Sequence, residues 1–110
     1  MSKLQPLRIP SGWSIDINNF YEFEPTEENI EWYFGSVLIG GCQKSTGLSF
    51  DSRYEPEGKP FGDFILVYQK IEFDKRGRVK NVTVLKVKKT KDKSEFINML
   101  EHFMITEDFN

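Results

Sequence analysis

Residues 64–87, FILVYQKIEFDKRGRVKNVTVLKV, contain the pattern that decides the fold of this 110-residue chain. Two runs rich in β-branched and aromatic residues, Phe64–Phe73 and Val79–Val87, flank the polar segment Asp74–Arg78. Such residues fit the pleated surface of a sheet, and Gly77 can take the positive φ that a tight connection needs. The stretch therefore predicts a β-hairpin, and with it an antiparallel sheet.

The first third of the chain is predicted to contribute shorter strands. Residues 13–18 alternate apolar and polar side chains with a period of two, as a half-buried strand does. A turn at residues 10–12 precedes this strand, and residues 4–9 and 20–24 are also predicted to be extended. Residues 36–40 predict a short buried strand, which the chain leaves through its glycine pair.

Two further segments before the hairpin are predicted to be a helix and a loop. Thr26 can cap a short helix that ends at Gly35, with early glutamates that suit the helix dipole. Gly, Pro, Ser and Asp recur throughout residues 43–63. This composition predicts a long surface loop with at most one short strand near residues 48–50.

The last element is predicted to be an amphipathic helix. Asp92 and Glu95 have the spacing of a capping box, with Ser94 as a competing cap. The apolar face is predicted to contain Phe96, Ile97, Met99, Leu100, Phe103 and Met104. The sequence thus predicts a single α+β domain over residues 1–110, an antiparallel sheet of four or five strands with this C-terminal helix packed on one face.

The composition is that of a folded protein, with 38% hydrophobic and 15% aromatic residues. Cys42 is the only cysteine, so no intramolecular disulfide can form, which favours a reducing compartment. No apolar run approaches the ~20 residues of a membrane helix, and no signal segment opens the chain. We expect a cytoplasmic protein that does not enter the membrane.

The residues that could take part in catalysis or bind a ligand do not indicate an enzyme, a cofactor site or a metal site. His102 is the only histidine and falls on the polar helix face, so a two-histidine metal site is excluded. Cys42 follows a glycine pair but has no base nearby in sequence to make it a thiolate. The segment Gly40–Gly47 lacks the glycine spacing of a phosphate-binding loop. The carboxylates are predicted to form a solvated acidic face.

The charges are strongly segregated along the chain, although the formal net charge is only −2. Residues 9–43 contain six acidic residues and no Lys or Arg, whereas residues 70–93 contain ten basic residues. This separation steers partners of opposite charge toward different surfaces.

The acidic segment is interleaved with aromatic residues, a mixture suited to a protein interface with a basic partner. The predicted partner-binding residues are Tyr21, Glu22, Glu24, Glu27, Glu28, Glu31, Trp32 and Tyr33.

The basic hairpin offers an alternative, nucleic-acid binding through residues 70–93. Its candidate residues are Lys75, Arg76, Arg78, Lys80, Lys86 and Lys88, with Tyr68 and Phe73 available for stacking. Even spacing predicts that the last three lysines share one side of their strand. Two observations argue against this alternative. The pI of the chain is near 5.4, and proteins often place lysines on edge strands simply to prevent aggregation.

The first quarter of the chain carries a resemblance, in the segments Ile9-Pro10-Ser11-Gly12-Trp13, Asn18-Asn19-Phe20-Tyr21 and Glu24-Pro25. It resembles the opening of a family of small, uncharacterised Gram-positive bacterial proteins, some of them immunity proteins encoded beside polymorphic secreted toxins. The basic hairpin departs from the acidic character of such proteins. The resemblance implies a cytoplasmic protein that inhibits a basic toxin domain by occlusion, without catalysis, with the glutamates steering association.

Overall fold

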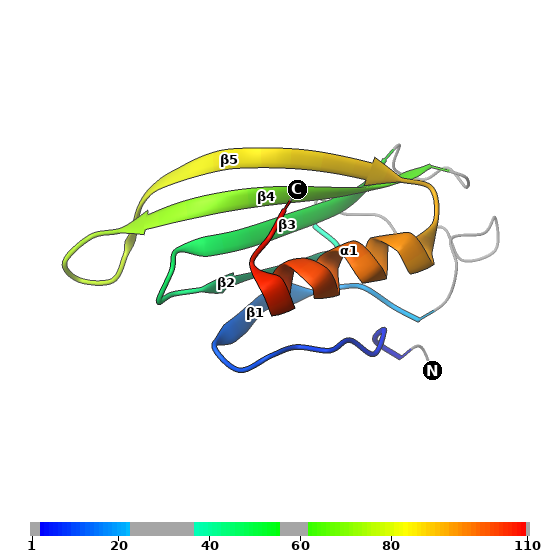
Figure 1. Cartoon of the computed structure of the whole chain (residues 1–110), viewed down its shortest axis with the longest axis horizontal. Helices are drawn as coiled ribbons and strands as arrows, with labels where there is room; N and C mark the ends of the chain where they lie inside the picture. Colours follow the sequence, from blue (N-terminus) through cyan, green and yellow to red (C-terminus); the bar gives the residue numbers. More distant parts are fainter. Residues whose placement is uncertain (1–2, 23–36, 56–61, 110) are drawn as a thin grey trace.

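The computed structural model of the chain describes residues 3–22, 37–55 and 62–109. Within these residues, five strands form one antiparallel sheet in chain order, and one helix packs against a face of it (Figure 1). The elements are β1 (Trp13–Asn18), β2 (Ile39–Gln43), β3 (Leu48–Glu55), β4 (Asp63–Phe73), β5 (Val79–Thr90) and α1 (Lys93–Thr106). This architecture confirms the predicted α+β fold.

The β4–β5 hairpin is the longest part of the sheet and confirms the strand prediction over residues 64–87. Its connection turns through Gly77 at a φ of 78°, and its tip projects beyond the other strands (Figure 1). The register shifts twice along the hairpin, where Leu85 and Lys80 are the extra residues in β5. Each such bulge interrupts the alternation of side chains between the two faces.

Strand β1 has the predicted bounds, but its apolar residues do not all face the core. Asp16 is an extra residue between the pairs formed by Ile15 and Ile17, so a bulge interrupts the alternation. Trp13 is buried, whereas Ile17 lies on the other face and is 43% exposed. The arm before β1 runs beside the segment that follows β1, through an isolated bridge between Leu4 and Tyr21 and a hydrogen bond from the Gln5 backbone N–H to the Phe20 carbonyl oxygen at 2.8 Å.

The prediction of a strand over residues 36–40 was wrong in its position. The strand β2 starts three residues later, and Gly40 and Gly41 lie inside it. Both are buried because neighbouring strands crowd them. A Cβ on Gly41 would lie 2.6 Å from the Ser14 carbonyl oxygen and 3.3 Å from the Phe50 ring. The glycines therefore permit close packing in mid-strand and do not end the strand.

The prediction of a long loop over residues 43–63 was also wrong, although a strand does begin at Leu48, where a short one was expected. Strand β3 occupies eight of these residues and lies between β2 and β4. Phe50, Ser52 and Tyr54 alternate inward from it. The hydroxyl of Ser52 accepts a hydrogen bond from the Ile39 backbone N–H at 3.0 Å and donates one to its carbonyl oxygen at 2.6 Å. The buried Ser52 hydroxyl thus has hydrogen-bond partners in the core, and Ser52 does not mark a turn.

The expected helix between Thr26 and Gly35 lies outside the described residues, as do residues 56–61 of the expected loop. No helix in the described part of the chain has the length and apolar content needed to cross a membrane.

The helix α1 begins as predicted, at Asp92. The Asp92 carboxylate accepts hydrogen bonds from the backbone N–H groups of Ser94 at 2.8 Å and Glu95 at 3.3 Å. It satisfies two of the N–H groups that a helix start leaves without partners. The helix ends where Glu107 adopts the left-handed conformation and donates to the Phe103 carbonyl oxygen.

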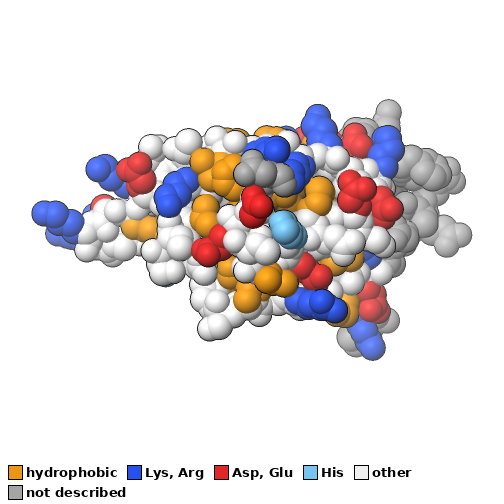
Figure 2. Space-filling model, in the orientation of Figure 1, with side chains coloured by type: hydrophobic (Ala, Val, Ile, Leu, Met, Phe, Trp, Pro, Cys, Tyr) orange, Lys and Arg blue, Asp and Glu red, His pale blue; other side chains and the backbone are white. Residues whose placement is uncertain are grey.

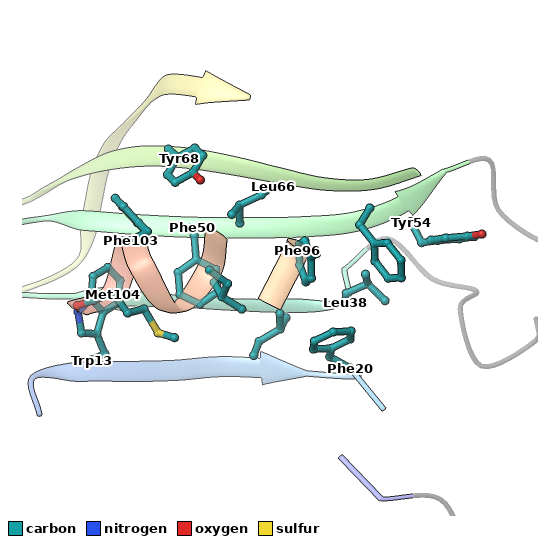
Figure 3. Packing of buried hydrophobic residues seen from close by; sticks show 13 residues of the cluster. Trp13, Phe20, Leu38, Phe50, Tyr54, Leu66, Tyr68, Phe96, Phe103 and Met104 are labelled. Atoms are coloured by element: carbon teal, nitrogen blue, oxygen red, sulfur yellow. The ribbon is translucent and has the colours of Figure 1, made fainter. Parts of the chain in front are cut away.

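The core lies between α1 and the sheet, and aromatic rings form much of it (Figure 3). The rings of Tyr68 and Phe103 meet edge to face, with centroids 4.7 Å apart. The Trp13 indole N–H donates to the Met104 carbonyl oxygen at 2.9 Å, which joins β1 to the last turn of α1. Phe20 is fully buried against Phe96, with centroids 5.2 Å apart. The predicted apolar helix face is confirmed, with Phe96, Leu100, Phe103 and Met104 buried.

We predict that Gly41→Ala lowers the free energy of unfolding by about 1–3 kcal/mol, because the added methyl group overpacks the sheet. Gly40→Ala is the matched control, since its nearest contact would be 3.4 Å from the Phe50 carbonyl oxygen, an ordinary distance. Urea unfolding of both variants measures the difference. Equal losses of stability would contradict the packing role of Gly41.

Candidate protein-binding surface

The structure describes only the start of the predicted acidic surface, Tyr21 and Glu22. Tyr21 is half-buried, and Glu22 is exposed with its backbone N–H bonded to the Lys3 carbonyl oxygen at 3.0 Å. Both follow Phe20, whose ring lies 5.3 Å from the Lys93 ammonium at the start of α1. The other predicted residues lie outside the described ranges: Glu24, Glu27, Glu28, Glu31, Trp32 and Tyr33.

Strand β5 is one edge of the sheet. It pairs with β4 along one side, and no strand of the described residues pairs with its other side. Ten of its twelve residues are exposed, and only Lys88 and Thr90 are not. A sheet edge of this length presents a row of backbone N–H and C=O groups that can pair with another chain.

A row of exposed valines lies on the face of β5 that points away from α1. Leu66 and Tyr68 of β4 belong to the core beneath α1, so the alternate residues of β4 point to the opposite face, namely Val67, Gln69, Ile71 and Phe73. The valines pair with these outward residues of β4. They are Val79, Val82, Val84 and Val87, and they are 45–59% exposed. Aliphatic side chains thus line an open sheet edge on one face.

Two lysines occupy the other face of the same strand. Lys86 pairs with Tyr68 and Lys88 with Leu66, so both lie on the side of α1. The Lys88 ammonium lies 5.4 Å from the centre of the Tyr68 ring. The two bulges interrupt the alternation between Lys86 and Lys80. Even spacing along the sequence therefore does not by itself place Lys80 on the face of the other two.

Tyr68 is not available for base stacking, contrary to the expectation for a nucleic-acid surface. Its side chain is 1% exposed and packs against Phe103 beneath α1. Burial raises the pKa of the Tyr68 hydroxyl to about 12, so the phenol is uncharged at neutral pH.

The basic turn at the tip of the hairpin is organised around a carboxylate. Asp74 accepts hydrogen bonds from the backbone N–H groups of Arg76 at 2.8 Å and Arg78 at 2.9 Å. The Arg78 Nε also lies 3.2 Å from the second carboxylate oxygen. The backbone hydrogen bond from Arg78 holds the pKa of Asp74 below its ordinary value. Figure 2 shows Lys and Arg side chains at this projecting tip, and Asp74 offsets part of their charge.

A shallow hollow of about 390 Å³ lies between β5 and α1. It is lined by Lys88, Asn98, Met99 and His102. His102 is exposed on α1, as predicted from the helix periodicity. Nothing in the sequence pattern connects Lys88 with His102, because the placement of α1 over the sheet brings them to one hollow. Its two basic side chains can contact an acidic group presented beside β5.

Cys42 is buried inside β2. Burial raises the pKa of its thiol above the ordinary value, and the nearby Asp16 carboxylate raises it further, while Lys44 acts in the opposite direction. The thiol is therefore protonated at neutral pH and is a poor nucleophile.

Among residues 3–22, 37–55 and 62–109, no group of three or more His, Cys, Asp or Glu side chains is placed to hold a metal ion. Comparison of the chain with protein-family models, curated proteins and solved structures finds no match. We therefore infer function from the geometry of the described residues.

We predict that Asp16→Asn accelerates alkylation of Cys42 by iodoacetamide at pH 8. The change removes a charge that raises the thiol pKa and leaves the burial of the sulfur in place, so the thiolate fraction increases. The rate is measured by mass spectrometry, with Glu22→Gln as a control that removes a distant carboxylate. A faster reaction in both variants, or in neither, would contradict the electrostatic coupling between Asp16 and Cys42.

Proposed function

We propose that this chain is a cytoplasmic protein-binding domain that acts by covering a surface of its partner, without catalysis of its own. The observation that carries the proposal is the row of exposed valines on the edge strand β5. Contiguous apolar side chains rimmed by charged residues are typical of protein interaction sites. The single cysteine, which cannot form an intramolecular disulfide, supports the cytoplasmic location.

The exposure of these valines indicates a binding surface, because edge strands ordinarily do not expose a row of aliphatic side chains. Proteins shorten or charge their edges so that other chains do not pair with them. Strand β5 carries lysines but also keeps five aliphatic side chains, the four valines and Leu85, in solvent over a strand of twelve residues. Covering these side chains with a partner would remove apolar surface from water, which favours association.

The acidic segment is the second part of the proposed interface. Tyr21 and Glu22 begin it, and its remaining glutamates would attract a basic surface and speed encounter. The narrower role, immunity against a secreted toxin through occlusion, is supported by the resemblance of residues 9–25 to immunity proteins. We propose it as the specific form of protein binding.

Nucleic-acid binding through residues 70–93 is the second candidate, and the projecting basic turn favours it. Lys75 and Arg76 are exposed there and can contact phosphates. The burial of Tyr68 and the pairing of Arg78 with Asp74 weaken this candidate. The valine row gives it no support, because phosphate contacts do not need aliphatic side chains. Protein binding is therefore the better account of the hairpin.

The test is affinity capture from a lysate of the source cells, with nuclease treatment in parallel. We expect the wild-type chain to retain a stoichiometric protein that survives nuclease. The double reversal Glu27→Lys with Glu31→Lys should reduce its recovery, because it removes the negative field that attracts a basic partner. A matched pair of reversals, Lys80→Glu with Lys86→Glu, tests the basic hairpin.

Recovery that disappears with nuclease would assign the chain to nucleic acid instead. Absence of any stoichiometric protein from the wild type would overturn the protein-binding proposal. A captured protein that itself is a nuclease, protease or pore-forming domain, and that the chain inhibits when both are purified, would support the immunity role.

A further inference from the structure

The outer edge of β5 can extend the sheet with a strand from another protein. Over residues 79–90 its backbone is paired on one side only by the described strands. In strand addition, main-chain hydrogen bonds supply affinity, and the alternating side chains of the added strand supply specificity. The chemistry of the two faces of β5 therefore specifies the sequence that the added strand must have.

Between Val82 and Lys88 the two faces of β5 differ in chemistry. One presents Val82, Val84 and Val87 to solvent, and the other presents Lys86 and Lys88 on the side of α1. Beyond this stretch Lys89 pairs with Ile65 and so lies on the face of the valines. Directly opposed side chains on neighbouring strands lie about 4.5–5.5 Å apart at their Cβ atoms and interact. An added strand would place alternate side chains beside the valines and beside the lysines. Aliphatic residues suit the first positions, and Asp or Glu suits the second.

A second copy of this chain is a poor occupant of the edge. Strand β5 contains four lysines and no Asp or Glu, so pairing β5 with another β5 opposes lysines to lysines or to neutral residues in every register. Like charges directly opposite each other destabilise a strand pair. The adjoining turn adds Lys75, Arg76 and Arg78 to the same repulsion. The lysines thus disfavour pairing of two β5 strands and favour an acidic strand at this edge.

A nucleic acid also fits the edge less well than a peptide. Its phosphates could reach the lysines, but they would leave the valine row in water. No aromatic ring of β5 is present for base stacking, since the strand contains none. An acidic peptide satisfies both faces at once.

We propose that an extended segment of a partner protein, with aliphatic residues alternating with Asp or Glu, adds to the β5 edge as a sixth strand of the sheet. The proposal rests on the protein-binding function and names the chemistry of the partner. The stretch from Val82 to Lys88 spans about 20 Å at ~3.3 Å per residue, so a partner segment of about seven residues covers it. The acidic residue beside Lys88 would lie next to the hollow that His102 helps to line.

The first experiment selects peptides from a displayed library of random twelve-residue segments, with the full chain as bait. We expect enrichment of peptides in which β-branched or aliphatic residues alternate with Asp or Glu. Hydrogen exchange with the best synthetic peptide should then protect backbone amides of residues 79–90. A consensus without acidic residues, or protection only elsewhere in the chain, would overturn the proposal.

The second experiment measures the affinity of that peptide for variants of the chain. Val82→Thr with Val84→Thr removes apolar surface but keeps β-branched side chains, and we expect a loss of affinity of about tenfold. Ile17→Thr is the matched control, since Ile17 is 43% exposed on the opposite edge strand β1, and its affinity should be unchanged. Lys86→Gln with Lys88→Gln should weaken binding and reduce its dependence on salt. Equal losses of peptide affinity in the β5 variants and in the Ile17→Thr control would overturn the proposal.

Two further measurements separate this inference from the general function. Competition by a twelve-residue thymidine oligonucleotide that displaces the peptide from β5 with higher affinity would assign the edge to nucleic acid. A protein partner captured as above, lost with the Glu27 and Glu31 reversals but unaffected by the Val82 and Val84 substitutions, would leave protein binding standing and refute the strand addition.

Discussion

The packing of one short helix on one face of a long sheet is the constraint on which the rest of this structure depends. At 1.5 Å per residue, the 14-residue helix α1 is about 21 Å long, whereas the 12 residues of β5 extend over about 40 Å. The core therefore forms where Phe96, Leu100 and Phe103 meet β4. The far part of the hairpin extends beyond the helix, and its side chains remain in solvent (Figure 1).

This constraint also explains the character of the candidate surface. Strand β4 lies inside the sheet and its residues 64–68 are buried, whereas β5 has a neighbour on one side only among the described strands and keeps its valines exposed. The lysines on the same strand discourage self-pairing, so the edge discriminates by charge between a second copy and an acidic segment. Stability and partner choice thus use different residues of one hairpin, since Leu66 and Tyr68 hold the helix while the valines and lysines face outward.

The elements with strong local signals were predictable, and those that depend on long-range packing were not. The hairpin follows from two β-branched runs around Gly77, and α1 follows from the Asp92 cap and its apolar period. Strand β3 was missed because Ser and Asp are common in turns, whereas here Ser52 bonds to the backbone of Ile39 in the core. The position of β2 was missed because Gly40 and Gly41 signal an ending unless a neighbouring strand and the Phe50 ring crowd them.

The features of the candidate surface also fall into two groups, those that follow from the local sequence and those that depend on long-range packing. By itself the sequence determined the separation of acidic from basic residues, the basic hairpin and the α+β class, because charge order, strand propensity and helix period are local properties of the chain. Only the tertiary structure decided that β5 is an edge among the described strands, that bulges at Leu85 and Lys80 interrupt its alternation, and that the valines share the face turned away from α1. Strand order and register depend on contacts between residues distant in sequence, which no local pattern encodes.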